Sequence, residues 1–183
     1  EILYCSNEGN IVKTASSNDY DSAGGIVGWS GSNNSSTGYS LYLVEKCYNK
    51  GNVTIENEEE YSYAGGIGCL SGSTANDCYN TGTITAKKGK ACGIVANGYA
   101  RNCYNVGTIT STVAPYQIAE NRYGSWVNNC YSMDNTTLAH MKTAEFINEI
   151  DKTAYKMDTE NVINGYPVLI WNPETSDNDN IEK

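Results

Sequence analysis

The chain has 183 residues, with 12 Lys and Arg against 21 Asp and Glu and a formal net charge of −9. This acidic balance disfavours nucleic-acid phosphates and anionic membranes as partners. No run of about 18 apolar residues is present that could cross a bilayer, so we expect neither nucleic-acid binding nor membrane insertion.

A short motif recurs along the chain, and each copy opens on a cysteine, as in CYNKGNVT, CYNTGTIT and CYNVGTIT. A second motif lies between the copies, as AGGIVG at 23–28, AGGIGC at 64–69 and ACGIVA at 91–96. The shortest interval, 25 residues, is the bare repeat, and the longer intervals of 42 and 31 residues add polar inserts. A core that recurs while its loops vary is typical of a repeat protein. The copies begin at Cys5, Cys47, Cys78, Cys103 and Cys130.

Alternation within each copy predicts strands. In CYNTGTIT, Cys78, Asn80 and Ile84 share one parity, and Tyr79 and Thr83 share the other. A period of two in segments rich in Ile, Val, Thr and Tyr is typical of β-structure. We therefore predict an all-β fold, a right-handed parallel β-helix of coils of about 25 residues over residues 1–136, with strands stacked at about 4.8 Å.

Such stacking would align equivalent residues into ladders. The cysteines should point inward as small, readily buried side chains. Because the chain has seven of them, no Cys-x-x-Cys and a single histidine, we predict mostly free thiols and no zinc site. The asparagines should satisfy backbone groups at a corner, and the glycines should permit its unusual backbone angles. The tyrosines should face outward: Tyr48, Tyr79, Tyr104 and Tyr131.

The pattern changes at residue 137. Apolar residues with helical spacing follow Thr143, a plausible N-cap, and Asn164-Gly165 is a turn signal between two apolar segments. We predict a small helix-plus-hairpin cap over residues 137–172 that covers the open edge of the last coil. It would do so with Phe146, Val168, Ile170 and Trp171. Residues 173–183 are polar and acidic and are expected to form a linker or tail to neighbouring domains.

The strand motif followed by AGGIVG resembles the GLUG-type repeats of bacterial surface proteins, whose core here is Gly25-Ile26-Val27-Gly28. The segment TAEFINEIDKTAYKMDTENVINGYPVLIW is similar to the module that often closes such arrays. The resemblance implies a secreted, cell-wall-associated protein, such as an adhesin, a glycan-handling protein or an accessory region of an IgA-cleaving metallopeptidase. It implies no catalytic residues.

The residues themselves offer little for catalysis. A cysteine nucleophile needs a nearby base, and the one histidine, His140, lies in the cap segment. Glycan cleavage needs a positioned carboxylate pair or a base with a cation. The acidic clusters, NDYD at 18–21 and ENEEE at 56–60, lie in inserts without interleaved Arg or Lys. We predict no catalytic residue, no cofactor and no metal site, with weak Ca²⁺ binding at these inserts left open.

Two functions remain. The first is a non-catalytic extracellular structural or adhesive domain, and the alternative is a carbohydrate-binding module attached to a glycan-active enzyme or sensor. The partner would be a glycan or a host surface receptor. Aromatic side chains among amides and hydroxyls suit a sugar ring, so we predict ligand contacts at the insert that follows Gly28 and along the tyrosine ladder. The candidate residues are Trp29, Tyr39, Tyr42, Tyr48, Tyr79 and Tyr104.

Overall fold

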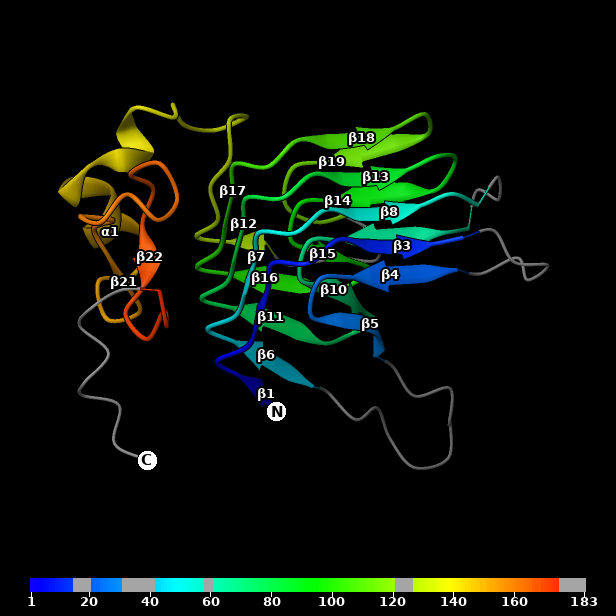
Figure 1. Ribbon diagram of the computed structural model, residues 1–183, viewed down its shortest axis with the longest axis horizontal. Helices are drawn as coiled ribbons and strands as arrows, with labels where there is room; N and C mark the ends of the chain where they lie inside the picture. The colour runs from blue at the N-terminus through cyan, green and yellow to red at the C-terminus, as the bar shows by residue number, and fades with distance from the viewer. Residues whose placement is uncertain (15–20, 31–41, 58–60, 121–126, 175–183) are drawn as a thin grey trace.

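The structure is a computed structural model that describes residues 1–14, 21–30, 42–57, 61–120 and 127–174. Within these ranges the chain is all-β, with most elements in parallel sheets and the helices confined to the C-terminal part (Figure 1). None of the helices in the described ranges is long and apolar enough to span a membrane.

Five parallel sheets each take one short strand from successive repeats. Sheet A contains β1 (Ile2–Leu3), β6 (Leu43–Glu45), β11 (Thr74–Asn76), β16 (Tyr99–Arg101) and β20 (Val127–Asn128). Sheet B contains β2 (Ser6–Asn7), β7 (Tyr48–Asn49), β12 (Tyr79–Asn80) and β17 (Tyr104–Asn105). Sheet C contains β3 (Ile11–Lys13), β8 (Val53–Ile55), β13 (Ile84–Ala86) and β18 (Ile109–Ser111). Sheet D contains β4 (Ser22–Gly24), β9 (Tyr63–Gly65), β14 (Lys90–Cys92) and β19 (Ala114–Tyr116). Sheet E contains β5 (Val27–Ser30), β10 (Gly68–Leu70) and β15 (Val95–Ala96).

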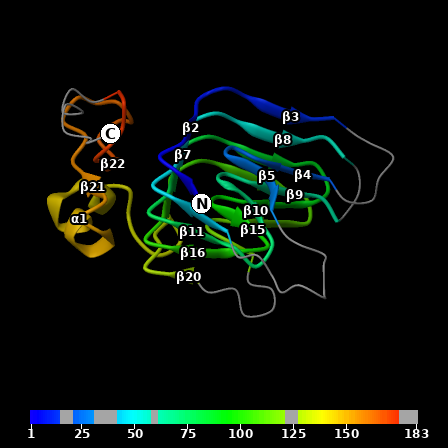
Figure 2. The same ribbon diagram turned by 90° about the horizontal axis from the view of Figure 1, so that it is seen from below.

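The chain enters sheets A, B, C, D and E in turn and then returns to sheet A (Figures 1 and 2). We number the repeats accordingly: the first runs from β1 to β5, the second from β6 to β10, the third from β11 to β15 and the fourth from β16 to β19. The register aligns equivalent motif residues, so that Tyr79 pairs with both Tyr48 and Tyr104. Isolated bridges from Val95 to Ala119 and from Tyr104 to Tyr131 continue sheets E and B.

The cysteines that open the repeats lie in the interior. Cys47, Cys78 and Cys103 are fully buried, Cys130 is nearly so, and all seven cysteines of the chain are free thiols, as the sequence predicts. Each buried thiol of this row donates to the carbonyl two residues earlier, as Cys78 Sγ does to Asn76 O at 3.1 Å. Burial raises the pKa of the Cys78 and Cys103 thiols well above the ordinary value. These thiols are packing groups rather than nucleophiles.

The asparagine ladder is also confirmed. Asn49 Nδ2 donates to Asn80 Oδ1 at 2.7 Å, and Asn80 Nδ2 donates to Asn105 Oδ1 at 2.8 Å. The same Asn80 amide donates to the Gly82 carbonyl at 2.9 Å, two residues along the chain. Each interior asparagine therefore joins its own corner to the neighbouring repeat.

The role predicted for the corner glycines is wrong. Gly51, Gly82 and Gly107 are not among the residues with positive φ. Glycine is needed there because the repeats approach closely: a Cβ on Gly82 would lie 2.0 Å from the Gly51 carbonyl oxygen, and one on Gly107 would lie 2.0 Å from that of Gly82. The left-handed corner falls instead on the residue before each cysteine, at Tyr4, Lys46, Asp77, Asn102 and Asn129.

The C-terminal module, which we define as residues 137–174, contains the 3₁₀ helix η1 (His140–Lys142), helix α1 (Ala144–Ile150) and an antiparallel hairpin of β21 (Tyr155–Lys156) and β22 (Val168–Leu169). The predicted N-cap is confirmed, since the Thr143 side chain accepts from the Phe146 amide at 3.2 Å. The turn signal is confirmed as well, with φ of 59° at Asn164 and 83° at Gly165.

The position of this module differs from the prediction. It lies beside sheet B rather than over the last repeat (Figures 1 and 2), and Phe146 and Val168 share a buried cluster with the tyrosine row. Ile170, expected to be covered, is exposed. The reason is that the stacked tyrosines present a broad aromatic face. Covering this face removes more apolar surface from water than covering the narrow edge of one repeat would.

Candidate functional site: a hollow on the outer face of sheet A

The ligand residues predicted in the insert after Gly28 do not lie together on one loop in the part of the chain that the structure describes. Trp29 lies on β5 in sheet E rather than in a loop, and its side chain is 50% exposed. Tyr42 precedes β6 and is exposed, with its backbone N–H donating to Ser73 Oγ at 3.1 Å and its carbonyl accepting from Thr74 N at 3.0 Å. Tyr39 lies outside the described residues.

The three predicted ladder tyrosines are buried and do not form an exposed binding surface. Tyr48, Tyr79 and Tyr104 have no solvent-exposed area. Their rings stack with centroids 5.0 and 5.2 Å apart and interplanar angles of 2° and 10°. The row does face away from the interior of the repeats, as predicted, but the C-terminal module covers it.

The hydroxyls of these tyrosines bond to the covering module. Asn172 Nδ2 donates to the Tyr79 hydroxyl at 3.3 Å, and the Tyr104 hydroxyl donates to the Pro167 carbonyl. Burial raises the pKa of Tyr48 to about 12. The tyrosine row is therefore the docking surface for the protein's own C-terminal module.

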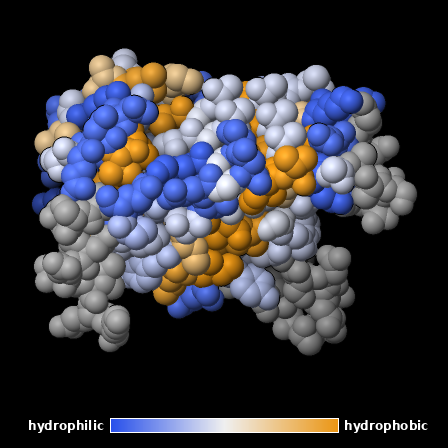
Figure 3. All heavy atoms as spheres, viewed as in Figure 1, coloured by the Kyte–Doolittle hydropathy of each residue, from blue (hydrophilic) through white to orange (hydrophobic). Residues whose placement is uncertain are grey.

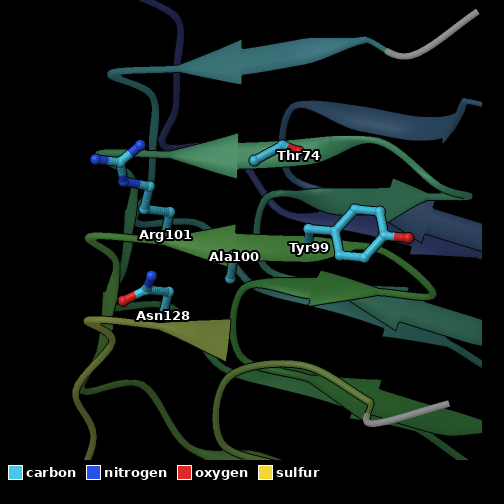
Figure 4. A pocket seen from close by; sticks show the side chains of 5 residues that line it. All are labelled: Thr74, Tyr99, Ala100, Arg101 and Asn128. Atoms are coloured by element: carbon cyan, nitrogen blue, oxygen red, sulfur yellow. The ribbon is translucent and has the colours of Figure 1, made fainter. Parts of the chain in front are cut away.

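A different surface has the form of a binding site. A hollow of about 520 Å³ lies on the outer face of sheet A, across β11, β16 and β20. Figure 4 shows that Tyr99 and Arg101 project from β16, with Thr74 on the neighbouring β11 and Asn128 on β20. The buried Ala100 lies between Tyr99 and Arg101 and completes the lining.

Strand geometry positions these side chains. Tyr99 and Arg101 are two residues apart on one strand, so they share a face of the sheet. Tyr99 is in register with Thr74, and Arg101 is in register with Asn128. The hollow thus combines an aromatic ring, a guanidinium, an amide and a hydroxyl within three adjacent strands. These are the groups that can stack on a sugar ring and hydrogen-bond its substituents.

None of the residues that line this hollow was predicted as a ligand residue from the sequence. Tyr99 and Arg101 lie in the segment GYARN immediately before Cys103, where parity alone predicts that they face outward. Two sequence features indicate the site when they are combined. One is this alternation, and the other is the rarity of arginine, which occurs only at positions 101 and 122. The tyrosines of the repeated motif were predicted instead because they recur.

Asp21 and His140, the other charged groups considered from the sequence, have structural partners. Asp21, from the first acidic insert, accepts from Asn57 Nδ2 at 2.6 Å and forms an ion pair with Lys13 at 3.3 Å, while residues 18–20 and 58–60 of the inserts lie outside the described ranges. His140 pairs with Glu149 at 2.9 Å, and this hydrogen bond raises the pKa of the imidazole. In the part of the chain that the structure describes, no three His, Cys, Asp or Glu side chains converge to hold a metal ion.

Comparison with known proteins identified no relative of this chain. No family model matches the chain, and neither does a curated protein or a solved structure.

Proposed function

We propose that the repeats form a right-handed parallel β-helix, a solenoid that serves as a non-catalytic structural or adhesive domain of a bacterial cell-surface protein. The chain's path through sheets A to E, and its return to sheet A in each repeat, supports this architecture. The resemblance of the repeats to the GLUG type supports a secreted, cell-wall-associated location. We also propose that this domain is part of a larger chain, in which it is tethered to neighbouring domains.

The continuous asparagine ladder is the observation that carries the structural role. From Asn7 to Asn105, four side-chain amides are joined by hydrogen bonds of 2.7, 2.7 and 2.8 Å that run across the repeats. Buried, fully paired amides specify one register and rigidify the stack. A scaffold of this kind holds its outer loops and faces at fixed positions, as a stalk or adhesive surface requires.

A carbohydrate-binding role is the second candidate, and the hollow on sheet A favours it. Tyr99 supplies an aromatic face at a shallow, open surface, and Thr74, Arg101 and Asn128 supply hydrogen-bonding groups around it. An open surface on a rigid sheet suits an extended glycan better than a small, enclosed substrate.

One experiment tests both candidates. The purified chain and a Tyr99→Ala variant are incubated with a glycan array, and soluble oligosaccharides incubated with the protein are analysed by mass spectrometry. Retention on the array that the variant loses supports carbohydrate binding at the hollow. Absence of retention leaves the structural role alone. Cleaved oligosaccharides would overturn the proposal of a non-catalytic domain.

A further inference from the structure

We propose that the hollow on sheet A selects glycans that carry a carboxylate, with Arg101 as the group that binds it. This inference rests on the proposed carbohydrate-binding function and names the ligand class of the same site. It depends on three features of the described residues: the free guanidinium of Arg101, the position of Tyr99 beside it, and the arrangement of the neighbouring acidic groups.

Arg101 is an exposed cation with no acidic partner among the residues that the structure describes. Within the described ranges it forms no ion pair, although the chain carries a net charge of −9. The lysines Lys13, Lys46, Lys50 and Lys90 are each within 4.0 Å of a carboxylate. A guanidinium presents a planar fork of donors that matches a carboxylate with two parallel hydrogen bonds. The guanidinium of Arg101 is therefore open to an external anion.

The backbone of Arg101 is fixed, so the guanidinium is presented from a rigid element. Its carbonyl accepts from Asp77 N at 3.1 Å and from Cys103 Sγ at 3.0 Å, and the strand pairs on both sides with β11 and β20. A site on a paired strand holds its donors more accurately than one on a loop.

Among the described residues, the acidic groups around Arg101 have partners of their own. Asp151 accepts from Asn102 Nδ2 at 3.4 Å and from Thr153 N at 2.8 Å. Glu45 lies on the same sheet two strands away, since Asn76 pairs with both Glu45 and Arg101, and Glu45 has Lys46 at 3.3 Å. Asp77 is buried and accepts from Asn102 Nδ2 at 3.0 Å. On the other side of Arg101 lies Asn128, which is uncharged. A carboxylate would therefore enter from the Asn128 side of the hollow.

Tyr99 lies one pleat along the same strand, about 7 Å from Arg101 between Cα atoms. Figure 4 shows the Tyr99 ring and the Arg101 side chain extending in opposite directions along β16, so the two groups would contact different sugars of one oligosaccharide. One sugar would stack on Tyr99, and a neighbouring sugar would place its carboxylate at Arg101, while Thr74 and Asn128 bond to hydroxyls. A neutral sugar would keep the stacking and lose the charge-assisted bonds, which sets the expected preference at about 10- to 100-fold.

The test uses an array of uronic-acid and sialic-acid glycans, each printed beside its own methyl ester, at an ionic strength of about 0.15 M, where long-range repulsion from the acidic chain is screened. The wild-type chain should bind the acids about 10- to 100-fold more tightly than the esters. Arg101→Gln should bind both forms equally, and Arg101→Lys should recover part of the preference. Tyr99→Ala should weaken both forms.

Lys88→Gln is the matched control, because it removes one positive charge from an exposed residue between β13 and β14, away from sheet A. It should bind like the wild type, and an equal loss in Lys88→Gln and Arg101→Gln would overturn the assignment to Arg101. Equal binding of acids and esters by the wild type, lost in Tyr99→Ala, would overturn the inference and leave carbohydrate binding intact. No binding to any glycan would overturn both.

Discussion

Cys5 and Cys78 open equivalent repeats, yet Cys78 is fully buried and Cys5 is partly exposed. The same contrast holds for Asn7 and Asn80, and for Ile11 and Ile84. Figure 3 shows apolar surface along the strands of the first repeat, where Leu3 and Val12 are 39% and 56% exposed. The motif is the same in both repeats, but Cys78, Asn80 and Ile84 have a neighbour on each side.

The comparison indicates that the motif stabilises the protein through contacts between repeats rather than within them. If each repeat gains most of its stability from its neighbours, substitutions in the third repeat should cost much more than identical substitutions in the first. The corner glycines and the asparagine ladder offer matched pairs for this test.

The largest difference is expected at the glycines. A Cβ on Gly82 would lie 2.0 Å from the Gly51 carbonyl oxygen, which is backbone and cannot move aside. A Cβ on Gly9 would meet only Asn7 Oδ1, at 3.8 Å. Gly82→Ala should therefore lower the free energy of unfolding by about 3 kcal/mol or more, and Gly9→Ala should change it by less than about 0.5 kcal/mol. Urea denaturation followed by circular dichroism measures both, and equal effects would contradict the comparison.

The asparagines should show a smaller difference. Asn80→Ala removes two donated bonds and one accepted bond. The Gly82 carbonyl loses its bond from Asn80, while Asn49 Nδ2 keeps only its bond to Gly51 O and Asn105 Oδ1 keeps only its bond from Gly107 N. The loss of these buried hydrogen bonds should lower the free energy of unfolding by about 1–3 kcal/mol. Asn7→Ala removes two donated bonds at the exposed end, where water can replace them. A loss of stability in Asn7→Ala as large as that in Asn80→Ala would show that burial does not determine how much each ladder asparagine stabilises the fold.

Much of the fold could be predicted from these repeated residues. The parity of Cys78, Asn80 and Ile84 gives the strands and the inward row, because alternation in a strand is a purely local property. The corner glycines were predicted at the right positions for the wrong reason. Crowding by the Gly51 carbonyl is a contact between residues 31 apart in the chain, which local backbone preferences do not reveal.

The site could not be predicted in the same way. Tyr79 and Tyr99 both face outward by parity, but the C-terminal module covers Tyr79 completely, whereas Tyr99 remains partly exposed. That docking depends on a tertiary contact between segments such as Asn172 and Tyr79, which are 93 residues apart. Repetition marked the tyrosines that stabilise the fold, whereas the non-repeated Tyr99 and Arg101 line the hollow.

Asp77 offers a test by pH at the left-handed corner. Burial raises its pKa above the ordinary 3.8, and the hydrogen bond from Asn102 only partly opposes this shift. Well below pH 3.8 the carboxyl is protonated in both folded and unfolded chains, and stability is lost as the pH rises from this unfolded value through the raised folded pKa. Asp77→Asn should therefore raise the melting temperature at pH 7 and leave it unchanged at pH 3. Asp134→Asn, at an exposed position, is the control, and a gain in Asp77→Asn that persists at pH 3 would contradict the electrostatic cause.

The smallest effect is expected at the same corner in the second repeat. Lys46 has a φ of 52°, whereas the fourth repeat has Asn102 at this position with a φ of 49°. Asparagine tolerates the left-handed region better than lysine, so Lys46→Asn should relieve backbone strain there. It also removes the ion pair with Glu45 at 3.3 Å, which at this part-exposed position contributes about 0–1 kcal/mol. The net gain should be a few tenths of a kcal/mol, measured as a shift of the urea midpoint with an unchanged slope. Lys50→Asn is the matched control, because Lys50 is outside the set of positive-φ residues and pairs with Glu174 at 2.6 Å. It should lose stability, and a comparable gain in both variants would exclude the backbone as the cause.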